Sequence, residues 1–210
     1  SLAEKNTYVD SLLLLYDLRL EHFGSHPKRG KAYILDRKAR EHLTYRESDR
    51  EGIRKDFEIA IAAQVEANGT ADAELVAIYF KNLCDDYKND VVDAMTIVTA
   101  YESNAKYFAN LDASQSELKV QFDACFGASG AASCDNLQKI FEPKIAAAPS
   151  DEKLLAHAFQ LMSKANCESD FYLSVGEMYY GVNPQSSIAM LLAQIFQNKK
   201  DFAKANKYLR

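Results

Sequence analysis

The sequence has no tryptophan, and its 210 residues contain only four prolines and eight glycines. An all-β fold has many short strands, and the turns between them are rich in glycine and proline. The low content of these residues therefore argues against an all-β fold. The longest run of leucine, isoleucine and valine in the chain is Leu12–Leu15, whereas a membrane-spanning helix needs about 20 apolar residues. With 48% apolar and 26% charged residues, the chain has the composition of a folded protein. We expect no membrane span.

Motifs for chemistry are also missing. No two of the four cysteines have the close spacing of a zinc site. The stretch GASGAAS, residues 127–133, lacks the Gly-Lys-Ser/Thr ending of a phosphate-binding loop. His22 and His26 are four residues apart, but Gly24 and Pro27 break the helix that would align them. We therefore expect no catalytic residue, no metal ligand and no cofactor. An enzyme without a recognisable motif is an alternative.

Four aspartates lie close together, at positions 85, 86, 90 and 93. A calcium loop needs a regular series of oxygen ligands and a central glycine, which this stretch lacks. We expect these aspartates to be solvated residues at helix ends.

Apolar residues recur at three- and four-residue spacing nearly from end to end, which is the pattern of helices that bury one face. No segment shows the sustained alternation of a strand. The sequence therefore predicts an all-α fold of about eleven helices, at residues 9–23, 28–46, 53–68, 75–87, 91–108, 114–126, 134–148, 150–166, 169–181, 185–198 and from 200 onward.

The connections between these helices are short, which makes consecutive helices antiparallel neighbours. Eleven such helices cannot easily share one bundle core, so a stacked α-solenoid is the expected architecture. Alternate helices start about 35 residues apart in the second half and about 43 in the first, a period typical of helical repeats. We expect residues 1–126 to form a half with longer helices and residues 134–210 to form a second half of one continuous solenoid.

The last helix pair carries a family resemblance. In residues 185–210, a large, a small and an aromatic residue share one face of the first helix, and an aromatic, a small and a large residue follow on the second: Leu192, Ala193 and Phe196, then Phe202, Ala205 and Leu209. This stretch resembles a tetratricopeptide repeat. The two alanines would let the helix backbones approach while the larger side chains fill the space around them. The match is poorer in residues 151–182, where Tyr172 or Ser174 takes the small position of the second helix.

The resemblance implies a right-handed superhelix with a concave groove for a protein or peptide partner. The groove-facing residues of the last repeat would be Ser187, Met190, Gln194 and Gln197. This set is neutral, so we do not expect a clamp for a C-terminal carboxylate. The repeat breaks off at Arg210 inside its second helix. We therefore expect further residues, further repeats or a partner to cover that apolar face.

The whole chain is also similar to repeat-containing exported proteins of Bacteroidota-type bacteria, through LLLLYDLRLEHFG near its start and SCDNL later on. This similarity implies a periplasmic or cell-surface location, and a cytoplasmic location is the alternative. Together the two resemblances imply a non-catalytic scaffold for protein–protein interaction.

The corner AAAPSDEKLL, residues 146–155, predicts which cysteines lie near each other. Pro149 ends one helix, and Ser150 is expected to cap the next. Cys134 lies sixteen residues before Ser150 and Cys167 lies seventeen after it, so two antiparallel helices bring them together. A Cys134–Cys167 disulfide is sterically reasonable in an oxidising compartment. The alternatives are a bond between Cys134 and Cys125, and free buried thiols.

Residues 19–55 contain eleven lysines and arginines against six acids, while the whole chain has a net charge of −5. Such a segment favours a second hypothesis, a binder of an anionic ligand (a sugar acid or a nucleic acid) through the basic helix 28–46. The alternative interpretation is a solvated helix face with pairs such as Arg37 and Glu41. Because the chain is acidic overall and lacks a nucleic-acid-binding signature, we expect no nucleic acid partner.

Overall fold

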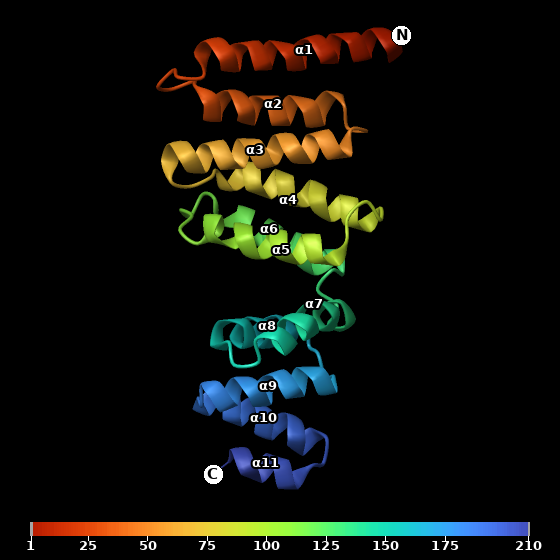
Figure 1. Cartoon of the computed structure of the whole chain (residues 1–210), viewed down its shortest axis with the longest axis vertical. Helices are drawn as coiled ribbons and strands as arrows, with labels where there is room; N and C mark the ends of the chain where they lie inside the picture. The colour runs from red at the N-terminus through yellow and green to blue at the C-terminus, as the bar shows by residue number, and fades with distance from the viewer. Residues whose placement is uncertain (1, 210) are drawn as a thin grey trace. The chain divides into compact units, whose positions relative to one another are not determined.

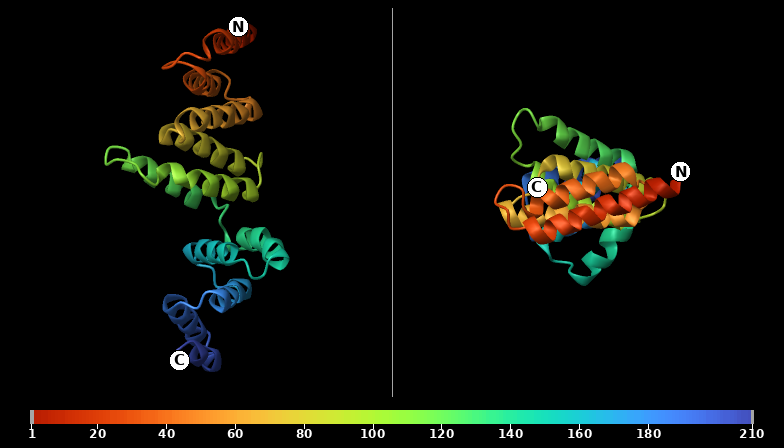
Figure 2. Two further views of the ribbon diagram at one scale, coloured as in Figure 1. Left: turned by 60° about the vertical axis from the view of Figure 1, so that its left-hand side comes forward. Right: turned by 90° about the horizontal axis from the view of Figure 1, so that it is seen from above.

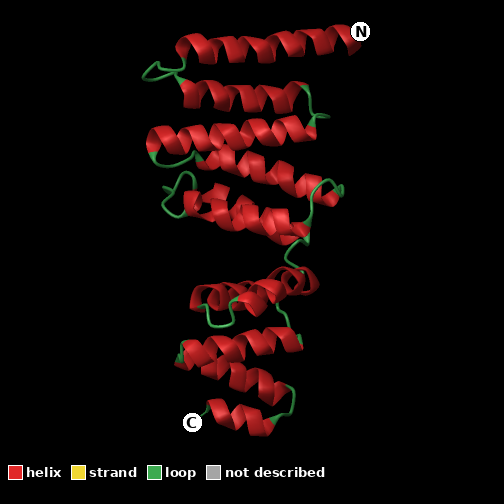
Figure 3. Ribbon diagram, viewed as in Figure 1, coloured by secondary structure: helices red, strands yellow, loops and turns green. Residues whose placement is uncertain are grey.

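The computed structural model describes residues 2–209, and side chains from residue 6 to residue 209. It confirms the all-α prediction, because the described residues form eleven α-helices and one 3₁₀ helix and contain no strand (Figure 3). The helices are α1 (Leu2–Phe23), α2 (Lys31–Tyr45), α3 (Arg50–Asn68), α4 (Ala73–Lys88), α5 (Ala94–Asn104), η1 (Ala105–Phe108), α6 (Ser116–Ser129), α7 (Cys134–Ala147), α8 (Glu152–Lys164), α9 (Asp170–Val182), α10 (Ser186–Asn198) and α11 (Phe202–Tyr208).

Helix ends follow their capping residues. The helix predicted at 91–108 begins later, because Asp93 caps α5 by accepting a hydrogen bond from the Thr96 backbone N–H at 2.8 Å. The N-cap of α8 is Asp151 rather than the expected Ser150, since the Asp151 carboxylate accepts hydrogen bonds from the backbone of Lys153 and Leu154. A carboxylate at this place also interacts favourably with the helix dipole.

The chain divides into two compact units, residues 1–129 and 130–210. The boundary lies inside the Gly/Ser/Ala-rich stretch 127–133. Helix α6 takes up the first three residues of that stretch, and Gly130 follows with a φ of +75°. This left-handed conformation suits glycine, which has no Cβ to clash with the backbone.

In the first unit, helices adjacent in sequence pack against each other. Helix α1 packs on α2, α2 on α3, and α3 on α4, which in turn packs on both α5 and α6 (Figure 1 and Figure 2). An aromatic cluster joins α4, α5 and α6. The Phe80 ring centroid lies 4.5 Å from that of Phe122, and the Tyr101 ring stacks on Phe126 at 3.9 Å. Contacts of this kind add to the free energy of simple burial.

A buried carboxylate ties α3 to α4. Asp86 is 1% exposed, and it accepts hydrogen bonds from Arg50 Nε at 2.6 Å and from Arg54 at 2.9 Å. The expectation that the aspartates at 85–93 are solvated is therefore wrong for Asp86. The sequence did not reveal this role because both arginines lie more than thirty residues away along the chain.

In the second unit, each helix likewise packs on the next one in sequence, from α7 to α11 (Figure 1). A close approach of three helices lies at Gly176 on α9. A Cβ added there would come within 2.7 Å of the Phe159 ring on α8 and within 2.9 Å of Leu192 on α10. Gly176 is therefore the small residue at this contact, whereas Tyr172 is buried as a large side chain and Ser174 is exposed.

Candidate interaction surfaces

The four residues expected to face a groove all lie exposed on α10. Ser187, Met190, Gln194 and Gln197 follow one another at helical spacing and form a single stripe, which we call the α10 stripe. Met190 is 68% exposed. The opposite face of α10 is buried and contains Leu192 and Phe196, so the helix is amphipathic and presents an uncharged stripe to solvent.

The residues expected to pack the last helix pair divide into two groups. Leu192, Ala193, Phe196 and Ala205 are buried. Phe202 and Leu209 are not, with exposed fractions of 62% and 56%, which corrects the interpretation that they fill the space between the helices.

Tyr208 takes that place on α11. Its ring stacks on Phe196 with centroids 5.9 Å apart, and its hydroxyl donates to Glu177 at 2.8 Å. Burial, and after it the hydrogen bond to the Glu177 carboxylate, raise the pKa of Tyr208. Helix α11 begins at Phe202. The Phe202 side chain therefore lies in the first turn of the helix, and it is exposed rather than packed.

Cys134 and Cys167 are joined by a disulfide with an S–S distance of 2.08 Å. It links the first residue of α7 to the segment after α8, as the geometry of the corner at residues 146–155 suggested. Cys125, the alternative partner of Cys134, is free, and so is Cys84.

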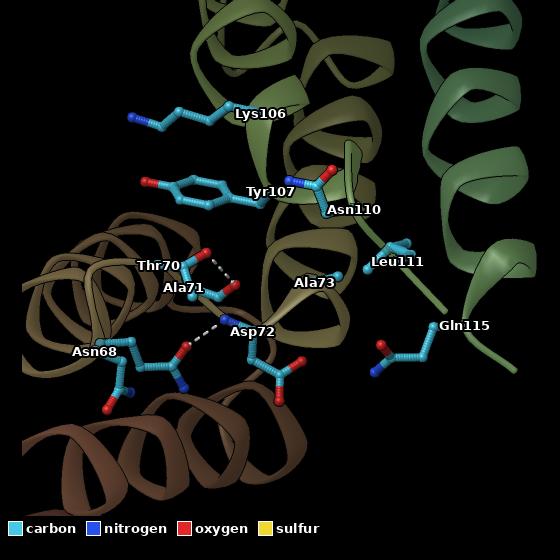
Figure 4. Close-up of a pocket in the computed structure, with 11 residues that line it drawn as sticks. Asn68, Thr70, Ala71, Asp72, Ala73, Lys106, Tyr107, Asn110, Leu111 and Gln115 are labelled. Carbon is cyan, nitrogen blue, oxygen red and sulfur yellow. Dashed lines mark hydrogen bonds between the residues drawn. The ribbon is translucent and has the colours of Figure 1, made fainter. Parts of the chain in front are cut away.

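A polar pocket of about 600 Å³ lies in the first unit (Figure 4). One side is the turn from α3 to α4, and the other is the segment from Lys106 to Gln115. The turn forms because Gly69 ends α3 in the left-handed conformation, with a φ of +73°, and Asp72 caps α4. The full lining is Gln64, Asn68, Thr70, Ala71, Asp72, Ala73, Lys106, Tyr107, Asn110, Leu111 and Gln115.

The polar side chains of this pocket are amides, hydroxyls, the Asp72 carboxylate and the Lys106 ammonium group. Gln64 and Asp72 already have structural partners, since Gln64 accepts from the Asp72 backbone N–H at 2.7 Å and Asp72 accepts from that of Glu74 at 2.8 Å. The side-chain amides of Asn110 and Gln115 add hydrogen-bond donors and acceptors to the lining. The described residues also contain no group of three or more His, Cys, Asp or Glu side chains that could hold a metal ion.

A second cavity, of about 500 Å³, adjoins the pocket along α3, because Tyr107 lines both. Its wall includes Ile61, Val65 and Tyr79. The Tyr79 hydroxyl donates to Glu58 at 3.0 Å, and burial followed by the nearby Glu58 carboxylate raises the pKa of Tyr79. Sequence reasoning missed both cavities, because their walls come from segments far apart in the chain.

Most lysines and arginines of residues 19–55 form ion pairs with acidic residues of the same chain. Seven of its eleven cations form ion pairs within the described residues, such as Lys31 with Glu66 at 2.6 Å and Lys38 with Asp17 at 2.6 Å. The four that form no ion pair in this part of the chain are Arg19, Lys28, Arg29 and Arg37.

Two of these arginines lie over tyrosine rings. Arg19 lies 5.7 Å from the centroid of Tyr16, and Arg37 lies 6.0 Å from that of Tyr33. Arg37 also donates a hydrogen bond to the Tyr33 oxygen, which lowers the pKa of this tyrosine. The expected pair of Arg37 with Glu41 does not form. We call Tyr16, Arg19, Tyr33 and Arg37 the Arg–Tyr cluster.

Comparison of the chain with protein-family models, curated proteins and solved structures found no match. None of the described helices is long and apolar enough to cross a membrane.

Proposed function

We propose that this chain is a non-catalytic helical-repeat scaffold that binds a protein or peptide partner. The observation that carries the proposal is the α10 stripe, an uncharged row of exposed side chains centred on Met190, which is 68% exposed. An exposed methionine is common on surfaces that recognise peptides, because its flexible thioether adapts to different side chains.

The arrangement of the helices supports this proposal. Within each unit, the helices pack mainly on their neighbours in sequence, which is the organisation of helical repeats. We propose that the helices stack as an α-solenoid, with a right-handed superhelix of the tetratricopeptide type. Such stacks present extended surfaces rather than enclosed pockets, and they bind partners over several helices.

The chemistry of the stripe defines the partner. Gln194 and Gln197 offer amide donors and acceptors that match a peptide backbone. No charged residue belongs to the stripe, so the proposed partner is a peptide segment with apolar and neutral side chains at the contact. The same proposal includes a periplasmic or cell-surface location, which the Cys134–Cys167 disulfide supports, since such bonds persist in oxidising compartments.

Selection of peptides from a displayed random library tests the proposal. Peptides enriched on the unaltered protein should bind at least about tenfold more weakly to the double variant Met190→Glu/Gln194→Glu, because two carboxylates would be desolvated at the contact. Lys139→Glu is the matched control, since it makes the same charge change at an exposed site on α7. Equal binding of the selected peptides to the double variant would contradict the proposal.

A second candidate function is the binding of an anionic ligand at the Arg–Tyr cluster. It is favoured by the four cations, Arg19, Lys28, Arg29 and Arg37, that form no ion pair in the described part of the chain. The ligand class is a sugar acid rather than a nucleic acid, because the chain carries a net charge of −5.

An oligogalacturonate tests this second function. Its affinity should fall with added NaCl and be lost in Arg19→Ala/Arg37→Ala, while Lys31→Ala, whose ammonium already pairs with Glu66, should change it little. Affinity that is independent of salt, or unchanged in the double variant, would exclude the cluster as the site.

A further inference from the structure

The two free cysteines lie against each other in the first unit. Cys84 is on α4 and Cys125 is on α6, and these two helices pack side by side. The Phe80 ring on α4 lies 4.5 Å from the Phe122 ring on α6, and Cys84 and Cys125 follow about one turn later on these two helices, where each thiol affects the pKa of the other. Two cysteines at corresponding positions on packed helices are candidates for a disulfide. Both cysteines are free, so their thiols are available for exchange chemistry.

The two thiols have different surroundings. Cys84 is fully buried, whereas Cys125 is half-buried and lines a cavity of about 740 Å³. A space of this size can admit a small molecule. Two ammonium groups, Lys81 and Lys88, and two carboxylates, Glu74 and Asp85, line the same cavity. A disulfide substrate could therefore reach Cys125 but not Cys84.

The electrostatic environment assigns the same roles. The hydrogen bond from Cys84 lowers the pKa of Cys125, burial opposes this shift, and Lys88 lowers the pKa further. For Cys84, the hydrogen bond to Cys125 and then burial raise the pKa. Cys125 is accordingly the thiol that ionises first, and Cys84 keeps its proton to higher pH.

We propose that Cys125 and Cys84 form a thiol–disulfide exchange site for low-molecular-weight disulfides of the glutathione type, with Cys125 as the attacking thiolate and Cys84 as the resolving thiol. This assignment is independent of peptide binding at the α10 stripe, which lies in the other unit.

The exchange proceeds in two steps. The Cys125 thiolate attacks one sulfur of the substrate R–S–S–R, a Cys125–S–S–R bond forms, and R–S⁻ leaves and takes up a proton. Cys84 then loses its proton and attacks the Cys125 sulfur, the Cys84–Cys125 disulfide forms, and the second R–S⁻ leaves and is protonated. Two electrons pass from the cysteine pair to the substrate, which becomes two R–SH molecules.

Oxidised glutathione added to the full-length chain tests this site. The unaltered protein should lose two free thiols without gaining a glutathione adduct, and peptide mapping should find a peptide pair cross-linked through Cys84 and Cys125. Cys84→Ser should accumulate a stable adduct at Cys125. Cys125→Ser should react at least about tenfold more slowly, because Cys84 is buried. An adduct that persists on the unaltered protein, or equal reaction of both variants, would overturn the proposal.

A charge variant provides a measurement that does not depend on altering either cysteine. Lys88→Met should slow the loss of thiols, because the thiolate of Cys125 loses a neighbouring cation. Lys55→Met, which removes a cation paired with Glu51 on α3, is the control and should leave the rate unchanged. Equal rates in the two lysine variants would contradict the role of Lys88 in activating Cys125.

Discussion

Arg50 on α3 donates from its Nε to the Oδ1 of Asp86 on α4 at 2.6 Å, and the carboxylate that it meets is almost completely buried. Arg54 binds the other carboxylate oxygen at 2.9 Å. Buried charges of this kind are tolerated because both carboxylate oxygens have cationic partners, and removal of one member leaves the others without compensation.

Asp86→Asn should therefore destabilise the first unit by roughly 2–4 kcal/mol, because two guanidinium groups lose their counter-charge. The measurement is urea unfolding followed by circular dichroism. Asp85→Asn is the matched control, since its neighbouring carboxylate is exposed, and it should change stability by no more than about 0.5 kcal/mol. Equal effects of the two substitutions would show that the ion pairs do not stabilise the contact of α3 with α4.

Gly176→Ala should destabilise the second unit by about 1–3 kcal/mol, because the added methyl group overlaps the Phe159 ring and Leu192 and forces α8, α9 and α10 apart. Gly181→Ala on the same helix has open space around its Cβ and should stabilise by up to about 1 kcal/mol through helix propensity. Thermal unfolding of the two variants measures both effects. A neutral Gly176→Ala would mean that the close approach is not required.

Removal of the disulfide in Cys134→Ser/Cys167→Ser should cost about 2–4 kcal/mol, because the unfolded chain regains the freedom of a loop closed over a separation of 33 residues. Denaturant unfolding with and without a reducing agent measures the loss. Reductant should lower the stability of the unaltered protein and leave the double variant unaffected. A second loss in the double variant would point to another bond.

Alkaline pH should weaken the first unit through Tyr101. Burial, and then the hydrogen bond to Asp123, raise the pKa of Tyr101 from 10.0 to about 12. The folded state therefore keeps this phenol proton up to a higher pH than the unfolded state does. The resulting stabilisation is complete below pH 10 and is lost as the pH rises from 10 to about 12.

Ultraviolet titration of phenolate absorbance checks the direction of this shift. Tyr101→Phe should remove a late step of the titration, whereas Tyr33→Phe should remove an early one, since the hydrogen bond from Arg37 lowers the pKa of Tyr33. Loss of the same part of the curve in both variants would contradict these environments.

The sequence was sufficient to predict the helices, because the spacing of apolar residues and the turn-forming pairs such as Asn68-Gly69 are local signals. It also placed Cys134 near Cys167, since one corner between two antiparallel helices sets that distance. Contacts between segments distant in sequence could not be read in this way. The burial of Asp86 depends on Arg50, and the polar pocket needs the turn at 68–73 to lie beside residues 106–115.

The sequence also could not show which of two aromatic residues on α11 is buried. Phe202 and Tyr208 both lie three residues from Ala205, so helical periodicity allows either one to pack beside it. Tyr208 is the buried one, because it has a ring partner in Phe196 and a hydrogen-bond acceptor in Glu177. Those partners lie on other helices, so the spacing of residues within α11 does not reveal them.

The Cys134–Cys167 bond also determines how the second unit responds to force. If the chain is pulled from its two ends, tension passes through the sulfur atoms, and the segment between them does not lengthen. Reduction would release about 110 Å of contour, given a separation of 33 residues and about 3.4 Å per extended residue. The disulfide thus makes α7 and α8 the inextensible part of an otherwise extensible unit.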